Sequence, residues 1–206
     1  MTALAWRDRQ RQRGERAARA DAELMAEFAA QLSAATTHGD VLVAAADLAR
    51  EQHGVTSVTL WSLDPADRGW WRRWYLTVPT DAPRAGRHAR ARMPVDRATE
   101  EGRLVLLPDP GSIAREFPEV AAYLDAQGLH ATGTFPALDA AGEPMGAIGF
   151  GWNGPRRLTS AEVARLTTVA RLCAETARRI DLTTAAATDA RNTPERVRRA
   201  SRSPRS

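Results

Sequence analysis

The sequence predicts a single α/β domain of the α+β type, in which an antiparallel sheet carries helices from both chain ends on one face. Apolar residues recur at helical spacing near both ends of the 206-residue chain. Between these ends, period-two patterns rich in β-branched and aromatic residues predict strands. The strands follow one another through short turns, which favours antiparallel pairing. Loops and short helices should therefore cover the other face of the sheet.

Helices are expected at both ends of the domain. The first should span residues 14–35, and Asp40 should cap a second over 41–52 that ends at Gly54. Thr159-Ser160-Ala161-Glu162 forms a capping box for a long helix that should end near Leu182. The apolar stripes of the first and last helices are Leu24, Met25, Phe28 and Leu32, and Val163, Leu166, Val169, Cys173, Ala177 and Ile180.

The middle of the chain should form the sheet and its connections. Strands are expected over residues 55–63, 70–78, 104–107, 129–138 and 145–152. The connections should be a turn over 64–69, a polar loop over 79–92, a short strand near 92–95, a helical turn over 96–101 ending at Gly102, a Pro-rich turn over 108–111 and a short helix over 117–127.

Charge and composition divide the chain into a basic flexible extension (1–19), a folded domain (20–183) and a disordered tail rich in Arg, Ser and Pro (184–206). The net charge is +4, and all 29 basic side chains are Arg. Residues 1–20 and 191–206 each carry six Arg, so the body between them is acidic. Basic tails allow contact with nucleic acid, but the acidic body and the lack of a nucleic-acid motif argue against that partner and favour solvated ends.

Several kinds of site are not expected. No apolar run is long enough to span a membrane and the N-terminus lacks a secretory apolar region, so we expect a cytoplasmic protein without a membrane partner. The lone Cys173 rules out an internal disulfide or a cysteine metal cluster. The four histidines lack ligand spacing, so no metal site is expected. Without an acid–base pair or an activated nucleophile, we expect no catalytic residues and no enzyme activity.

A GxGxxG pattern over residues 149–154 has the form of a nucleotide-binding turn, but its first two glycines lie inside an expected strand. We interpret Ala147, Gly149 and Gly151 instead as a smooth strand face against which a helix packs closely. Ile148, Phe150 and Trp152 should fill the opposite face.

The stretch from Ala131 to Ile180 resembles GAF domains. Gly142-Glu143-Pro144-Met145-Gly146-Ala147 is similar to their glycine turn between two strands, and Leu158-Thr159-Ser160-Ala161-Glu162 to the start of their final helix. The resemblance covers residues 20–183 and is to GAF domains of bacterial multidomain signalling regulators, which accompany histidine kinases and metal-dependent serine/threonine phosphatases. It implies a sensor or regulatory module that binds a small ligand or a signalling partner.

The resemblance leaves the cofactor unknown. The chain has no Lys, which excludes the cyclic-nucleotide pattern of the family. The free methionine sulfoxide reductase type needs more than one cysteine, and the phytochrome type needs a cysteine beside the pocket. Haem binding through a histidine stays open.

A ligand should lie between the sheet and a cover built from residues 79–128. The candidate ligand-binding residues are Trp61, Trp74, Tyr123, His130 and Phe150. The aromatic strand over 70–75, with Trp61 opposite, is either a pocket wall for a flat ligand or ordinary sheet core. The basic segment over 84–92 beside it allows an anionic ligand or a solvated loop.

The sequence therefore predicts a non-catalytic sensor that acts by changing the geometry of its terminal helices. Those helices should pair with a second copy to form a homodimer. Two alternatives stay open: a regulator that contacts nucleic acid through its basic tails, and a dimerisation scaffold without a ligand.

Overall fold

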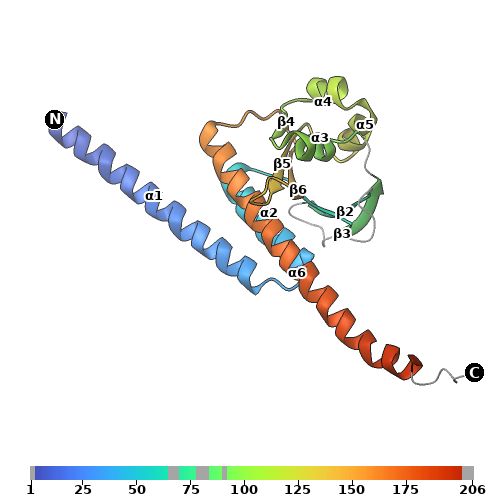
Figure 1. Ribbon diagram of the computed structural model, residues 1–206. Helices are drawn as coiled ribbons and strands as arrows, with labels where there is room; N and C mark the ends of the chain where they lie inside the picture. The colour runs from blue at the N-terminus through green and yellow to red at the C-terminus, as the bar shows by residue number, and fades with distance from the viewer. Residues whose placement is uncertain (1–2, 65–69, 78–83, 90–91, 201–206) are drawn as a thin grey trace, which may run out of the picture.

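The computed structural model describes residues 3–64, 70–77, 84–89 and 92–200, and it shows a sheet with helices on both faces (Figure 1). The strands are β1 (Ser57–Leu63), β2 (Trp70–Thr77), β3 (Arg84–Ala89), β4 (Val105–Leu107), β5 (Ala131–Leu138) and β6 (Pro144–Trp152). The helices are α1 (Ala3–Ala34), α2 (His38–His53), α3 (Pro94–Glu101), α4 (Pro110–Glu116), α5 (Pro118–Ala126) and α6 (Ser160–Ala200).

The six-stranded sheet has the order β3-β2-β1-β6-β5-β4, and every neighbouring pair is antiparallel. Two meanders, β1-β2-β3 and β4-β5-β6, meet where β1 pairs with β6 at the centre. Ser57 lies opposite Gly151 in that pair, and Ser62 lies opposite Gly146. The predicted α+β class with an antiparallel sheet is confirmed.

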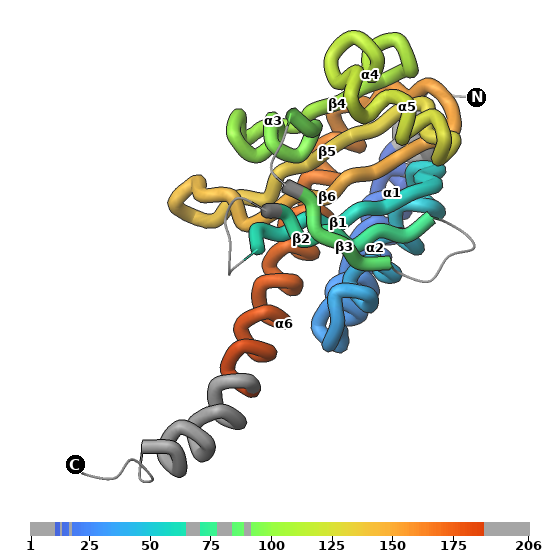
Figure 2. The backbone as a smooth tube through the Cα atoms, turned by 90° about the vertical axis from the view of Figure 1, so that its right-hand side faces the viewer, coloured from blue at the N-terminus to red at the C-terminus, as the bar shows by residue number. Residues whose placement is uncertain are grey.

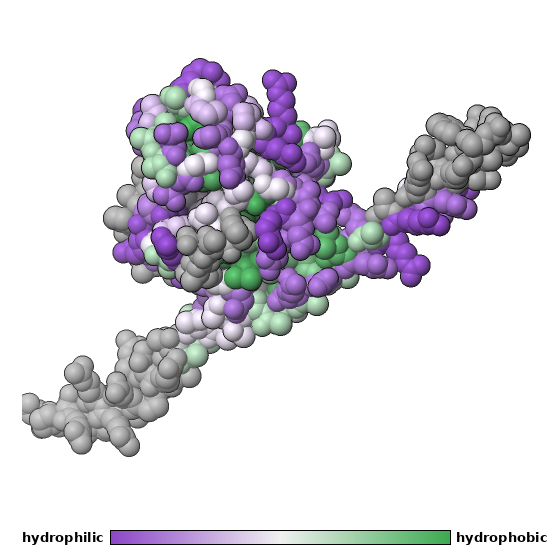
Figure 3. All heavy atoms as spheres, turned by 180° about the vertical axis from the view of Figure 1, so that it is seen from behind, coloured by the Kyte–Doolittle hydropathy of each residue, from purple (hydrophilic) through white to green (hydrophobic). Residues whose placement is uncertain are grey.

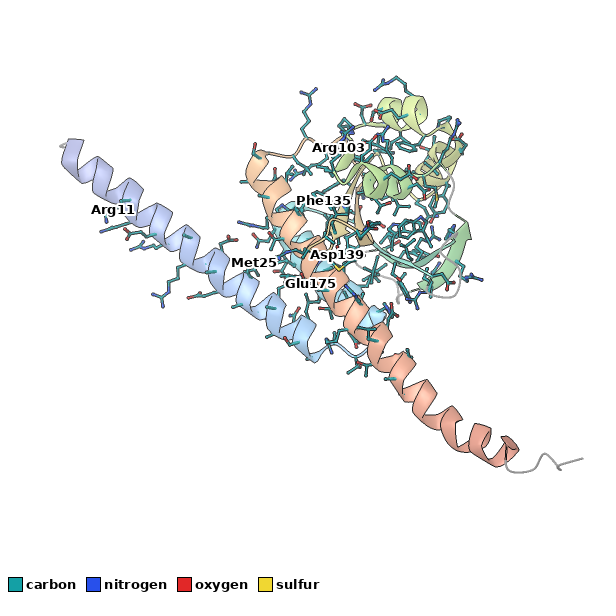
Figure 4. All side chains as sticks on the ribbon, in the orientation of Figure 1. Arg11, Met25, Arg103, Phe135, Asp139 and Glu175 are labelled. Carbon is teal, nitrogen blue, oxygen red and sulfur yellow. The ribbon has the colours of Figure 1, made fainter. Side chains whose placement is uncertain are left out.

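One face of the sheet is covered by α2 and α6, with α1 packed against both (Figures 1 and 2). Phe28 and Leu32 of α1 are buried in this core, as is Phe135, which Figure 4 shows beside α6. Val58 and Leu60 of β1 are fully buried beneath the helices. Both apolar stripes predicted for the first and last helices are therefore used largely within the chain.

The second helix begins one turn earlier than expected. Thr37, not Asp40, is its N-cap, and Asp40 completes a capping box from the third helical position. The carboxylate of Asp40 accepts hydrogen bonds from the backbone N–H groups of Thr36 and Thr37, which lower its pKa. Gly54 ends the helix with φ of 63°, as predicted, because this left-handed conformation suits glycine.

The other face of the sheet is covered by α3, α4 and α5. Trp71 of β2 donates a hydrogen bond from Nε1 to Asp96 Oδ1 over 2.8 Å, which fastens α3 to the sheet. A small separate core holds α4 and α5 in place. Its buried members are Ala98, Val105, Leu107, Ile113 and Phe117.

The cover differs from the expectation in three places. The expected loop over 79–92 contains β3, an edge strand whose sequence RAGRHA lacks β-branched residues. The expected strand near 92–95 is the start of α3, because Pro94 occupies its first turn. The expected turn at 108–111 begins α4, which Asp109 caps by accepting from the N–H of Ser112.

The terminal helices are longer than expected and project beyond the sheet at opposite ends of the molecule (Figure 1). α6 continues past Leu182 to Ala200. Ala and Arg, which are strong helix formers, make up half of this segment, and Pro194 is the one residue in it that strongly opposes a helix. Each helix thus crosses an expected boundary, at 19/20 or 183/184, and the division of the chain at those points stays a prediction. Residues 201–206 and most of the expected turn over 64–69 lie outside the described residues.

No helix in the described part of the chain combines the length and the apolar character that crossing a membrane requires.

Candidate functional site

A cavity of about 220 Å³ lies between the sheet and the cover formed by α3 and α5. Its floor is hollow because alternate positions of β6 are glycines. Successive side chains of a strand point to opposite faces, so Phe150 joins the core beneath the helices while Gly149 leaves the cavity face bare. Gly151 lies on the same face, where the side chain of Leu129 packs against it. A Cβ on Gly149 would come no closer than 3.6 Å to another described residue, Thr59.

The cavity combines aromatic walls with hydroxyl groups on its floor. The lining residues are Ser57, Thr59, Trp61, Arg73, Tyr75, Thr77, His88, Met93, Pro94, Val95, Val120, Tyr123, Leu124, Gln127, Leu129, Thr132, Thr134, Gly149, Phe150 and Gly151. No Asp or Glu is among them, so the described wall carries positive and no negative charge.

Arg73 brings that positive charge into the cavity from the middle of β2. Its guanidinium carbon lies 4.7 Å from the ring centre of Tyr75, 5.6 Å from that of Trp61 and 5.7 Å from that of Tyr123. Such cation–π contacts hold a cation in place without neutralising it. Arg73 Nε is buried and has no hydrogen-bond partner among the described residues.

His88 of β3 completes the basic side of the cavity. Its ring meets Trp61 edge-on, with 5.7 Å between the ring centroids. Burial lowers the pKa of His88, and the nearby charge of Arg73 lowers it further. The neutral imidazole is therefore favoured, which offers both a hydrogen-bond donor and an acceptor to a ligand.

The structure brings together only part of the predicted site. Trp61 and Tyr123 line the cavity, and Tyr123 is 44% exposed at its mouth. Phe150 borders the cavity, but its ring packs edge-on against Phe135 in the core beneath the helices. The ligand-binding role of these three residues stays a prediction.

Trp74 and His130 do not line the cavity and are removed from the candidate set. Trp74 neighbours Arg73 on β2, so its side chain lies on the opposite face, stacked on His38 with 3.9 Å between centroids. His130 precedes β5, and its backbone N–H donates to the carbonyl of Trp152. Sequence reasoning missed Arg73 and included Tyr75 only within the aromatic strand over 70–75, although the alternation that begins at Trp71 could have identified both.

The opposite face of β2 is tied to α6. Arg72 forms an ion pair and a hydrogen bond with Asp181, and His38 Nε2 lies 3.2 Å from the second oxygen of the same carboxylate. Burial alone would raise the pKa of Asp181, but the contacts with His38 and Arg72 outweigh it and lower the pKa. Asp181 is therefore a charged anchor between the sheet and the last helix.

The single thiol lies on the helix face of the sheet, away from the cavity. Cys173 of α6 is fully buried in the core, and burial raises the pKa of its thiol far above the usual range. A thiol that stays protonated is a poor nucleophile. Within the described residues, no group of three or more His, Cys, Asp or Glu side chains is placed to hold a metal ion.

Comparison with known proteins gives a family and a set of similar folds. A family model described as GAF domain matches residues 35–176. The fold is similar to the GAF domain of an Acinetobacter phosphoenolpyruvate-protein phosphotransferase, with a TM-score of 0.63, 14% identity, and coverage of 80% of this chain and 95% of that one. A search of curated proteins finds no match.

Two further similar structures come from proteins with different activities. The chromophore-binding domain of a bacteriophytochrome from R. palustris has a TM-score of 0.62 and 12% identity over 81% of this chain, which spans only 63% of that structure. A free methionine-R-sulfoxide reductase from Neisseria meningitidis, solved with its substrate, has a TM-score of 0.56 and 14% identity over 78% of this chain and 90% of that one. At such identities the likeness shows the fold alone.

Proposed function

Because the chain belongs to the GAF domain family, a sensor and regulatory fold, we propose that it is a non-catalytic sensor in which a small molecule occupies the cavity between the sheet and α3 and α5. The observation that carries this proposal is the cavity itself, floored by Gly149 and Gly151 and walled by aromatic side chains. Concave, largely apolar sites with a few polar groups are typical of ligand binding.

Binding without catalysis fits the side chains in the cavity. Two similar structures are of free methionine-R-sulfoxide reductases, so the fold alone does not decide whether a protein is an enzyme. Here the only cysteine lies in the core on the other face of the sheet, with its thiol held protonated. The cavity wall holds no carboxylate that could act as a general acid or base among its described residues.

Strand β2 supplies a route from the cavity to α6. Arg73 and Tyr75 face the cavity, while Arg72, between Trp71 and Arg73, binds Asp181 of α6. A ligand that contacts Arg73 would shift β2 and with it the anchor at Asp181. Asp181 is followed directly by exposed residues of α6, over 182–187. The helix continues away from the domain (Figure 1). A ligand with different affinities for two positions of the helix would then change their populations.

The experiment is a screen of a metabolite library by thermal shift and tryptophan fluorescence. Ligands of the cavity should raise the melting temperature and change the emission, because Trp61 lines the cavity. Trp61→Phe should remove the fluorescence response, whereas the matched variant Trp74→Phe, on the opposite face, should keep it. Ligands that raise the melting temperature, and whose fluorescence response in Trp61→Phe is the same as in the wild type, would show that the ligand binds outside the cavity.

We also propose that the output is carried by a homodimer formed through the projecting helices, with action in the cytoplasm. Leu182 on α6 is 63% exposed, and hydrophobic surface gathers in a strip where the projecting helices leave the body (Figure 3). Pairing with the same helices of a second copy would bury this surface. A signalling protein or, through the basic ends, a nucleic acid would be the alternative partner.

Light scattering tests the dimer. The wild-type chain should have twice the mass of the 22.5 kDa monomer at tens of micromolar, and Leu182→Glu should shift it to the monomer mass while its circular dichroism spectrum stays that of the folded chain. Thr183→Glu adds the same charge on the neighbouring exposed position and serves as the control. Leu32 is unsuitable for this test because it is buried in the core of its own chain. A wild-type monomer at that concentration would contradict the proposal.

A further inference from the structure

We propose that the cavity selects a small planar carboxylate, an anion on a flat unsaturated ring, and that Arg73 is its anchor. This inference rests on the proposed function, because it requires that the cavity binds a small molecule. Three observations support it: a cation without a carboxylate partner, neutral polar groups at the cavity, and an aromatic space large enough for one ring.

The first observation is the charge of the cavity. Arg73 contacts three aromatic rings, yet none of its described contacts is to a carboxylate, and its Nε is buried without a hydrogen-bond partner. A guanidinium in such surroundings binds an anion strongly because little water competes with it. Its planar fork matches the two oxygens of a carboxylate. Arg73 is also the only permanently charged residue among the described lining, so it balances one negative charge, whereas a phosphate monoester carries about 1.5–2 at neutral pH.

The second observation is the position of two neutral polar groups at the cavity. Trp61 Nε1 lies 3.8 Å from where a Cβ on Gly149 would stand, so its N–H is held over the bare floor. Thr132 Oγ1 is buried without a hydrogen-bond partner among the described residues, and it lines the cavity from β5. Buried polar groups normally have partners, so the hydroxyl of Thr132 indicates a polar atom of a ligand or a bound water. The hydroxyl of Thr132 and the N–H of Trp61 would contact ring substituents or the second oxygen of the anion.

The third observation is the size and shape of the space. An apolar cavity of about 150 Å³ is large enough for benzene. The present cavity of about 220 Å³ has room for one ring and a carboxylate group. Trp61, Tyr75 and Tyr123 offer ring faces and edges against which a flat body packs well.

The test uses four single-ring probes in isothermal titration against the full chain: benzoate, benzamide, benzylammonium and cyclohexanecarboxylate. Benzoate should bind most tightly. Benzamide has the same shape as benzoate but lacks its charge. It should bind about 10- to 100-fold more weakly, because that is the change in affinity that the loss of a charge-assisted hydrogen bond usually causes. Benzylammonium should not bind, and the puckered ring of cyclohexanecarboxylate should bind more weakly than benzoate.

Two arginine variants assign the selectivity to one residue. Arg73→Gln should remove the preference for benzoate over benzamide. Arg103→Gln removes the same charge from an exposed position that lies outside the cavity lining (Figure 4) and should keep the preference.

The outcomes separate this inference from the proposed function. Equal or tighter binding of benzamide or benzylammonium, with a change in Trp61 fluorescence, would overturn the carboxylate assignment and leave a ligand-binding sensor. Unchanged selectivity in Arg73→Gln would overturn the role of Arg73. Failure of all four probes at millimolar concentration would overturn the inference and, together with an empty metabolite screen, would contradict ligand sensing itself.

Discussion

Gly146→Val is expected to destabilise the fold by about 3 kcal/mol or more, a large loss for one substitution. A Cβ at position 146 would stand 2.2 Å from the backbone oxygen of Trp61 and 3.5 Å from the Cα of Ser62. Both atoms belong to β1, which pairs with β6 at the centre of the sheet. The backbone cannot move away without breaking this pairing.

Urea denaturation followed by circular dichroism measures the loss. Gly154→Ala is the matched control, because a Cβ there would meet nothing within 4 Å among the described residues and should change stability by no more than about 0.5 kcal/mol. Equal midpoints for the two variants would show that β1 and β6 do not approach as closely as the structure has them.

Gly146 is one of two sequence signals that helped to predict the fold and that the structure accounts for. Gly146 belongs to the segment that resembles the glycine turn of GAF domains, and the structure shows that its lack of a Cβ lets two central strands meet. The capping box of Thr159 and Glu162 forms as predicted, with the two residues 2.8–3.3 Å apart in three hydrogen bonds. The capping box is a local signal, because its two residues are close in sequence.

The cover was harder to predict. β3 is an exposed edge strand, so it needs neither the apolar alternation nor the β-branched residues that predict a buried strand. The extension of α6 beyond Leu182 was missed for a similar reason. Its residues form a helix by intrinsic propensity, without the buried apolar stripe that predicts a helix from sequence.

The site was predicted only in part, because on β2 the aromatic residues occupy both faces. Tyr75 lines the cavity, Trp71 packs with Val95 and Ala147 on the same face of the sheet, and Trp74 lies on the opposite face, so aromatic character could not tell which face holds a ligand. The glycines of β6 were recognised as a bare strand face but assigned to helix packing. Only Ala147 fits that interpretation, since it packs with Val95 of α3, whereas Gly149 and Gly151 lie under the cavity.

The second large effect is expected from Gly149→Leu, which should weaken ligand binding about 100-fold or more while the protein stays folded. The Cβ has room, with its nearest described neighbours at 3.6 and 3.8 Å, and the rest of the leucine side chain would enter the cavity. Gly149 has a φ outside the left-handed region, so leucine is not strained there. Burial of the apolar leucine side chain in the cavity should offset small shifts of the cover.

The central claim is that this cavity holds a small molecule. Native mass spectrometry of the wild-type chain, Gly149→Leu and Gly154→Ala against one metabolite library tests it directly. We predict that the wild type and Gly154→Ala form the same non-covalent adduct and that Gly149→Leu, with its melting temperature retained, does not. An adduct of equal abundance on all three proteins would contradict the claim, since it would show that the ligand binds outside the cavity.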